Sequence, residues 1–206
     1  MKEFWSGRIR EMTPYVPGEQ PRGRTFIKLN TNECPYPPSP RALEAVRAAA
    51  GDSLRLYPDP ECLELRQTIA RRYRLSENQV FMGNGSDEVL AFAFQAFFDP
   101  EREIVFPRVS YSFYPVYARY FGLRYRQIPM KDDFSVDLDA MMRENGGVVI
   151  PNPNAPTGMA LPLERIEALL RANPEAVVIV DEAYVDFGAD SAVPLIRDYP
   201  NLLVVQ

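Results

Sequence analysis

The chain has 206 residues and a net charge of −5, with 46% hydrophobic and 25% charged residues. This composition is typical of a soluble globular protein with one sizeable core, and it predicts neither a nucleic-acid-binding surface nor a membrane span. There is no histidine, which excludes Ser–His–Asp catalysis and histidine-based zinc sites.

Residues 1–40 are rich in proline, glycine and arginine and show no sustained hydrophobic period, so we expect an extended N-terminal arm with at most one short helix. A helix follows over "SPRALEAVRAAAG", with Ser39 as N-cap, Pro40 at its first position and Gly51 at its end. A second helix is expected over "ECLELRQTIARRYRL". Residues 41–75 are therefore predicted to lead into a large domain or to contribute to a small one.

From residue 76 to residue 206, short apolar runs alternate with helical patterns. We expect strands at "VFM", "EIVFP", "RYRQIPM", "GVVIPN", "AVVIVDEAY" and "LLVVQ", with helices between them. Such continuous apolar runs favour an α/β fold in which a mostly parallel sheet is flanked by helices on both faces. Ligands in these sheets bind beyond the carboxyl ends of the strands.

The segment "GNGSDE" joins the first of these runs to a helix. Gly83 and Gly85 permit tight turns, Ser86 can cap the helix, and the N–H groups of Ser86, Asp87 and Glu88 can form an anion site. Taken alone, the segment is better explained as a plain Ser-capped helix with an acidic first turn. The spacing matches neither the P-loop nor the dinucleotide fingerprint.

Three further corners carry polar or aromatic groups at predicted strand ends. "FPRVSYSFY" supplies rings that could lie flat on a planar ligand, although Phe113 and Tyr114 are also core candidates. "IPNPNAPTG" holds Asn152 and Asn154 in a rigid turn. Asp181 ends a central strand, where it either caps a turn or needs a cationic partner such as a protonated ring nitrogen.

Together the four corners offer a phosphate cradle, a stacking ring, a hydrogen-bond donor and an anion for a cationic ring nitrogen. Pyridoxal 5'-phosphate requires this set of groups. The anion keeps the pyridine nitrogen protonated, so that the ring can accept electrons from a carbanion. The sequence therefore predicts a pyridoxal-phosphate site without a metal ion.

The corner motifs occur in a familiar order. "MTPYVPGEQP", "IKLNTNECPYPPSP", "YPDP", "GNGSDE", "PRVSYSFY", "NPNAPTG" and "VVIVDEAYVDF" give the chain, over essentially its whole length, a resemblance to the histidinol-phosphate aminotransferase family. These are fold-type I, pyridoxal-phosphate-dependent enzymes that are normally homodimers. The resemblance implies transfer of an amino group between L-histidinol phosphate and 2-oxoglutarate, with glutamate as the other product, in histidine biosynthesis.

The resemblance also implies roles for individual residues. The backbone amides of Ser86, Asp87 and Glu88 would hold the cofactor phosphate, and Tyr111 would stack on the ring. Asp181 would pair with the pyridine nitrogen. It is one of two implied catalytic residues in this chain.

The second implied catalytic residue is Tyr184, which would donate to the phenolate oxygen of the cofactor. Tyr57, in "YPDP", would reach the phosphate of the cofactor in a neighbouring subunit. Tyr15 and Asn32 lie in segments that line the substrate site in such enzymes.

Two single-residue departures from the pattern are visible. Cys34 stands where the family commonly has asparagine. Ala155 stands where the superfamily has the asparagine that contacts the phenolate oxygen, and Asn154 or Asn152 is the candidate substitute. Cys34 and Cys62, without a secretory signal, are expected to be reduced thiols in a cytoplasmic protein.

The third departure concerns the Schiff-base lysine, which follows a strand like "NLLVVQ" in the family. The lysines of this chain are Lys2, Lys28 and Lys131, and none follows that strand. The predicted large domain is therefore incomplete within the 206 residues. Alternatives to the primary reading are an aromatic amino acid aminotransferase, a threonine-phosphate decarboxylase of the same fold, or a catalytically incomplete fragment.

Overall fold

The computed structural model describes residues 4–12, 18, 23 and 27–206. The chain divides into two compact units, one made of Met1–Met12 and Arg66–Gln206 and the other of Thr13–Leu65. The three-part division at residues 40 and 75 stays a prediction.

The helices and strands follow the order expected from the sequence. The α-helices are α1 (Gly7–Arg10), α2 (Pro40–Ala49), α3 (Leu63–Tyr73), α4 (Gly85–Phe97), α5 (Tyr114–Phe121), α6 (Leu138–Met141) and α7 (Leu163–Ala172). Short 3-10 turns are η1 (Asp52–Arg55), η2 (Glu77–Gln79), η3 (Val185–Phe187) and η4 (Val193–Arg197). The strands are β1 (Ile104–Pro107), β2 (Tyr125–Ile128), β3 (Gly147–Pro151), β4 (Val178–Asp181) and β5 (Leu202–Val205).

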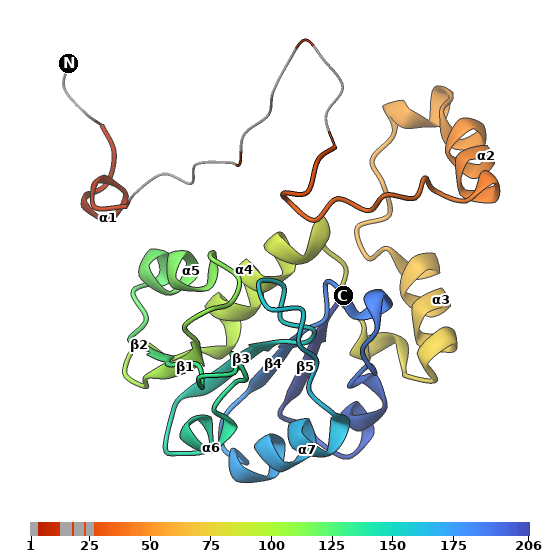
Figure 1. Cartoon of the computed structure of the whole chain (residues 1–206). Helices are drawn as coiled ribbons and strands as arrows, with labels where there is room; N and C mark the ends of the chain where they lie inside the picture. Colours follow the sequence, from red (N-terminus) through yellow and green to blue (C-terminus); the bar gives the residue numbers. More distant parts are fainter. Residues whose placement is uncertain (1–3, 13–17, 19–22, 24–26) are drawn as a thin grey trace. The chain divides into compact units, whose positions relative to one another are not determined.

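The five strands form one parallel sheet in the order β2-β1-β3-β4-β5. Helices cover both faces, with α4 and α5 on one side and α6 and α7 on the other (Figure 1). The predicted α/β fold with a parallel sheet flanked by helices is confirmed. Strands β1, β3 and β4 are buried on both faces, which is why they read as continuous apolar runs.

Two apolar clusters fill the space between the sheet and the helices. Alternate strand residues serve opposite faces because side chains change sides at each step. Ile179 packs with the cluster on the α4 and α5 face, and its neighbours Val178 and Val180 pack on the α6 and α7 face. All three side chains are fully buried.

Several helix boundaries match the predicted caps. The Ser39 hydroxyl accepts a hydrogen bond from the N–H of Ala42, and Pro40 is the first residue of α2. The Asp137 carboxylate caps α6 by accepting a hydrogen bond from the N–H of Ala140. Pro115 lies in the first turn of α5, where its missing N–H has no cost.

Two local predictions are wrong. Residues 80–82 form no strand, because no described strand lies beside this segment to pair with it. Phe81 is instead exposed and packs edge-to-face on Phe92 of α4. Ser86 does not cap α4: the N-cap residue is Asn84, and its N–H donates to the Glu88 carboxylate at 2.6 Å. The helix begins earlier because Gly85, with φ 81°, turns the chain before Ser86.

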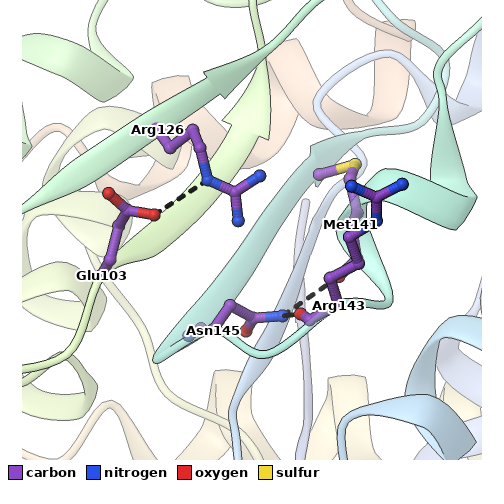
Figure 2. A network of polar contacts seen from close by, with 6 residues as sticks. Glu103, Arg126, Met141, Arg143 and Asn145 are labelled. Carbon is purple, nitrogen blue, oxygen red and sulfur yellow. Dashed lines mark hydrogen bonds and ion pairs between the residues drawn. The ribbon is translucent and has the colours of Figure 1, made fainter.

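A polar network lies at the end of the sheet where the strands begin (Figure 2). Arg126 donates to the Glu103 carboxylate at 2.8 Å, and the side-chain amide of Asn145 donates to the carbonyls of Met141 and Arg143. These contacts join β1 to β2 and close the turn between α6 and β3. Among the helices in the described part of the chain, none is long and apolar enough to cross a membrane.

The buried strand β4 provides a test of the core. Replacing Ile179 with alanine should lower the free energy of unfolding by roughly 2–5 kcal/mol, because a fully buried side chain leaves a cavity. Chemical denaturation of the two proteins measures the change. Phe187→Ala, at an exposed aromatic residue, is the control and should cost less than about 1 kcal/mol. Equal losses would show that the assigned core is wrong.

Candidate active site

The candidate site lies at the edge formed by the carboxyl ends of the strands. The register pairs Pro107 of β1 with Ile128 of β2, and Pro151 of β3 with Asp181 of β4, so these strands end together. From β1 the chain runs outward to β2 and then returns to β3 on the other side of β1. Such a reversal between neighbouring strands opens a ligand-binding crevice at their carboxyl ends.

The loops after β1 and β3 meet at this reversal. The side-chain amide of Asn154 donates to the backbone carbonyl of Val109 at 2.9 Å. Asn152 lies in the same turn and is committed to it, since its side chain accepts from the N–H of Leu161 at 2.7 Å and donates to the carbonyl of Leu161. Each of the two predicted substitutes for the missing asparagine at Ala155 keeps one unused hydrogen on Nδ2, so both remain candidates.

Asn154 also carries an unusual atom. Its side-chain oxygen Oδ1 is buried and has no hydrogen-bond partner among the described residues. Buried polar atoms almost always have a partner, so an unpaired one at a strand end fits a site that binds a ligand. The Nδ2 group has a second hydrogen beyond the one given to Val109, so the amide can also donate.

The start of α4 supplies amide donors. The first N–H groups of a helix have no acceptor within it, and those of Ser86 and Asp87 belong to this set. The amide of Glu88 is the first for which an intrahelical acceptor, the carbonyl of Asn84, is in position. Position 83 requires glycine, because the Cβ of any other residue would lie 2.7 Å from the side chain of Val89.

Tyrosines tie the start of α4 to the start of α5. The Asp87 carboxylate accepts a hydrogen bond from the Tyr111 hydroxyl at 2.6 Å and another from the Tyr117 hydroxyl at 3.2 Å. Burial, reinforced by the bond to and the charge of Asp87, raises the pKa of Tyr111 well above its ordinary value. The hydroxyl therefore stays protonated and remains a donor at neutral pH.

Asp181 is the buried charge of the site. One carboxylate oxygen, Oδ2, accepts from the Tyr114 hydroxyl at 2.6 Å, and Oδ1 accepts from the N–H of Ala183 at 3.2 Å. Burial raises the pKa of Asp181, these two bonds lower it, and the charge of Asp87 raises it. Among the described residues, no lysine or arginine forms an ion pair with Asp181.

Three of the predicted cofactor residues, Asp87, Tyr111 and Asp181, are linked through Tyr114. The rings of Tyr111 and Tyr114 meet edge-to-face, with centroids 5.7 Å apart. A continuous line of contacts thus runs from Asp87 through both rings to Asp181. Tyr184 lies three residues beyond Asp181, is half-buried, and packs near Phe187.

Other predicted site residues are not part of this line. Asn32 and Tyr57 belong to the second unit, where both are exposed. Tyr15 lies outside the described residues. Within the described ranges, no group of three or more Cys, Asp or Glu side chains is arranged to hold a metal ion.

Two residues with contacts at the site were not foreseen from the sequence. Tyr114 is buried as predicted for a core residue, but its hydroxyl bonds to Asp181. Glu182 is also buried, and its carboxylate accepts from the Ser191 hydroxyl, the N–H of Ala192 and the side chain of Gln206. An acidic residue directly after the strand was visible in the sequence, whereas its partners were not.

Comparison with known proteins fits this geometry. A family model described as aminotransferase class I and II matches residues 24–206. The chain belongs to this family. It is also 56% identical, over all 206 residues, to a curated histidinol-phosphate aminotransferase from Clostridium botulinum. The chain spans 58% of the length of that relative.

Solved structures of aminotransferases share the fold. The histidinol-phosphate aminotransferase from Sinorhizobium meliloti, solved in complex with pyridoxal-5'-phosphate, matches 81% of this chain and 47% of its own, with 31% identity and a TM-score of 0.73. The L-threonine-O-3-phosphate decarboxylase from Porphyromonas gingivalis matches 79% of this chain and 52% of its own at 24% identity and a TM-score of 0.69, which shows the fold alone. The resemblance inferred from the motifs is thus confirmed.

The raised pKa of Asp181 predicts that this side chain lowers the free energy of unfolding in a pH-dependent way. A carboxyl group whose pKa is higher in the folded protein is destabilising when ionised, so the cost is present at neutral pH and vanishes below the ordinary value of 3.8. Asp181→Asn should therefore raise the melting temperature by a few degrees at neutral pH. The gain should shrink as the pH falls through the raised pKa.

Thermal unfolding of both proteins over a range of pH values measures this difference. Asp186→Asn, at an exposed aspartate nearby, is the matched control and should change little. A lower melting temperature for Asp181→Asn at neutral pH would contradict the expectation.

Proposed function

We propose that this protein is a pyridoxal-phosphate-dependent aminotransferase that transfers the amino group between L-histidinol phosphate and 2-oxoglutarate. The observation that carries the proposal is Asp181, a carboxylate at the end of a central strand that has no cationic partner among the described residues. A buried charge of this kind is costly, and a protonated pyridine nitrogen would offset the cost.

The residues around Asp181 fit the rest of the same cofactor. The amides of Ser86 and Asp87, with Glu88 beside them, would hold its phosphate at the start of α4. Tyr111 donates to Asp87 at that helix start and packs on Tyr114, the partner of Asp181, and its ring would stack on the cofactor. Bound there, pyridoxal 5'-phosphate would supply an electron sink for a carbanion next to the substrate nitrogen.

The chain's own residues would set the electronic state of the ring. Asp181 would hold a proton on the pyridine nitrogen, and Tyr184 would donate to the phenolate oxygen. Asn154 has a free Nδ2 hydrogen for the same oxygen. The lysine that binds the cofactor covalently in this family has no counterpart after β4 in this chain.

The choice of substrate rests on sequence similarity. Eight curated histidinol-phosphate aminotransferases are 53–56% identical to the whole chain. Tyr15 and Asn32 are proposed to line the substrate site. Among the described residues, no contact favours an aromatic amino acid or phosphothreonine over histidinol phosphate.

We also propose a cytoplasmic homodimer. Tyr57 is 100% exposed in the second unit, as expected for a side chain that reaches the cofactor of another subunit. Its loop is held by Asp59, whose carboxylate accepts from the N–H groups of Glu61 and Leu63. A tyrosine on a fixed, exposed turn supports a role in a partner's site.

Cofactor binding is the first test. Pyridoxamine phosphate needs no lysine, so calorimetric titration of the 206-residue protein should detect it. Asp181→Asn and Tyr111→Ala should each weaken binding about tenfold or more, since they remove a charge-assisted contact or a stacking surface. Asp186→Asn is the control. Absence of binding to the wild-type protein would favour the incomplete-fragment reading.

Substrate choice needs the remaining part of the enzyme. Residues 1–206 can be joined to the C-terminal part of the Clostridium botulinum relative, whose N-terminal part is 56% identical. The chimera should convert histidinol phosphate with a kcat/KM at least about tenfold above that for phenylalanine. Asn32→Ala should lower this value without weakening pyridoxamine phosphate binding. A preference for phenylalanine or phosphothreonine would overturn the proposed substrate.

A further inference from the structure

Tyr114 is a buried hydroxyl next to the proposed cofactor site. It is the first residue of α5, its side chain is fully buried, and its hydroxyl donates to Oδ2 of Asp181 at 2.6 Å. The bond joins residues 67 positions apart in the chain. It therefore connects the helix that follows β1 to the end of β4.

Packing gives the Tyr114 ring a fixed position. It is stacked with Phe94 of α4 at a centroid distance of 6.3 Å and meets Phe106 of β1 edge-to-face at 5.8 Å. It also meets the ring of Tyr111 edge-to-face. Because three rings surround it, its hydroxyl cannot turn away from Asp181 without disturbing the core.

The hydroxyl is the feature that packing does not explain. Phenylalanine fills the neighbouring positions 94 and 106 in the same cluster, so a phenylalanine at position 114 would serve the core equally well. A buried hydroxyl carries a desolvation cost that is recovered only through its bond to Asp181. The hydroxyl therefore acts through its hydrogen bond to the Asp181 carboxylate.

We propose that Tyr114 is a positioning residue for the cofactor site, whose hydroxyl holds the Asp181 carboxylate in one orientation, as an anion, toward the ring nitrogen. This inference rests on the proposed function. Tyr114 fixes one oxygen and the N–H of Ala183 approaches the other, so rotation of the carboxylate is prevented. Accepting capacity remains, because each carboxylate oxygen can accept more than one bond.

The charge state of both groups agrees with this role. Burial, followed by the charge of Asp181 and the bond to it, raises the pKa of Tyr114 well above its ordinary value, so the hydroxyl keeps its proton. The same bond lowers the pKa of Asp181 against the effect of burial. Without it, Asp181 would be protonated more readily and would pair less well with a cationic ring.

Tyr114→Phe tests the role, with Tyr125→Phe as a matched control. Tyr125 packs on Phe106 in the same cluster, but its hydroxyl accepts from Arg119 rather than donating to Asp181. Pyridoxamine phosphate labelled with nitrogen-15 in its ring is added to each protein. Calorimetry gives the dissociation constant, and nuclear magnetic resonance gives the ring nitrogen's chemical shift, which reports its protonation.

We expect Tyr114→Phe to weaken binding about tenfold and to move the nitrogen signal toward the unprotonated position. Tyr125→Phe should leave both unchanged. Wild-type binding together with unaltered affinity and signal in Tyr114→Phe would overturn the role of Tyr114 alone. Failure of the wild-type protein to bind would overturn both this role and the proposed cofactor site.

Should Tyr114→Phe not fold, a fluorinated tyrosine at position 114 provides a second test. It keeps the ring and makes the hydroxyl a stronger donor. The nitrogen signal of bound pyridoxamine phosphate must then move, because the basicity of Asp181 changes. An unchanged signal would overturn the proposal.

Discussion

The arrangement of the site depends on one buried negative charge. Asp181 ends an apolar strand that has a neighbour on either side, in a sheet covered on both faces. A carboxylate in such surroundings is tolerated only when hydrogen bonds and a positive charge compensate for lost water. The protein supplies two hydrogen bonds, from Tyr114 and Ala183, and no lysine or arginine among the described residues forms an ion pair with this carboxylate.

This constraint explains why rings surround the site. Tyr111, Tyr114 and Tyr117 all belong to the segment after β1, and their hydroxyls meet the carboxylates of Asp87 and Asp181. The rings of Tyr111 and Tyr114 meet edge-to-face between those acidic groups. Aromatic residues thus act at once as core and as hydrogen-bond donors.

The architecture and much of the site were accessible from the sequence because they rest on local patterns. Continuous apolar runs predict a parallel sheet, and an aspartate after such a run must lie at the strand's carboxyl end. The bond between Tyr114 and Asp181 was not accessible, because it joins distant segments through side-chain geometry that no spacing rule encodes. The absence of a strand at residues 80–82 likewise depends on a missing neighbour rather than on propensity.

The turns at the strand ends are fastened to the fold by their own side chains. Asn154 ties the loop after β3 to the loop after β1, Asn152 closes its turn onto Leu161, and Tyr111 is held on Asp87. These loops are therefore already ordered in the folded protein before a ligand binds. Little conformational entropy remains to be lost when a small molecule enters, so more of its contact energy is expressed as affinity.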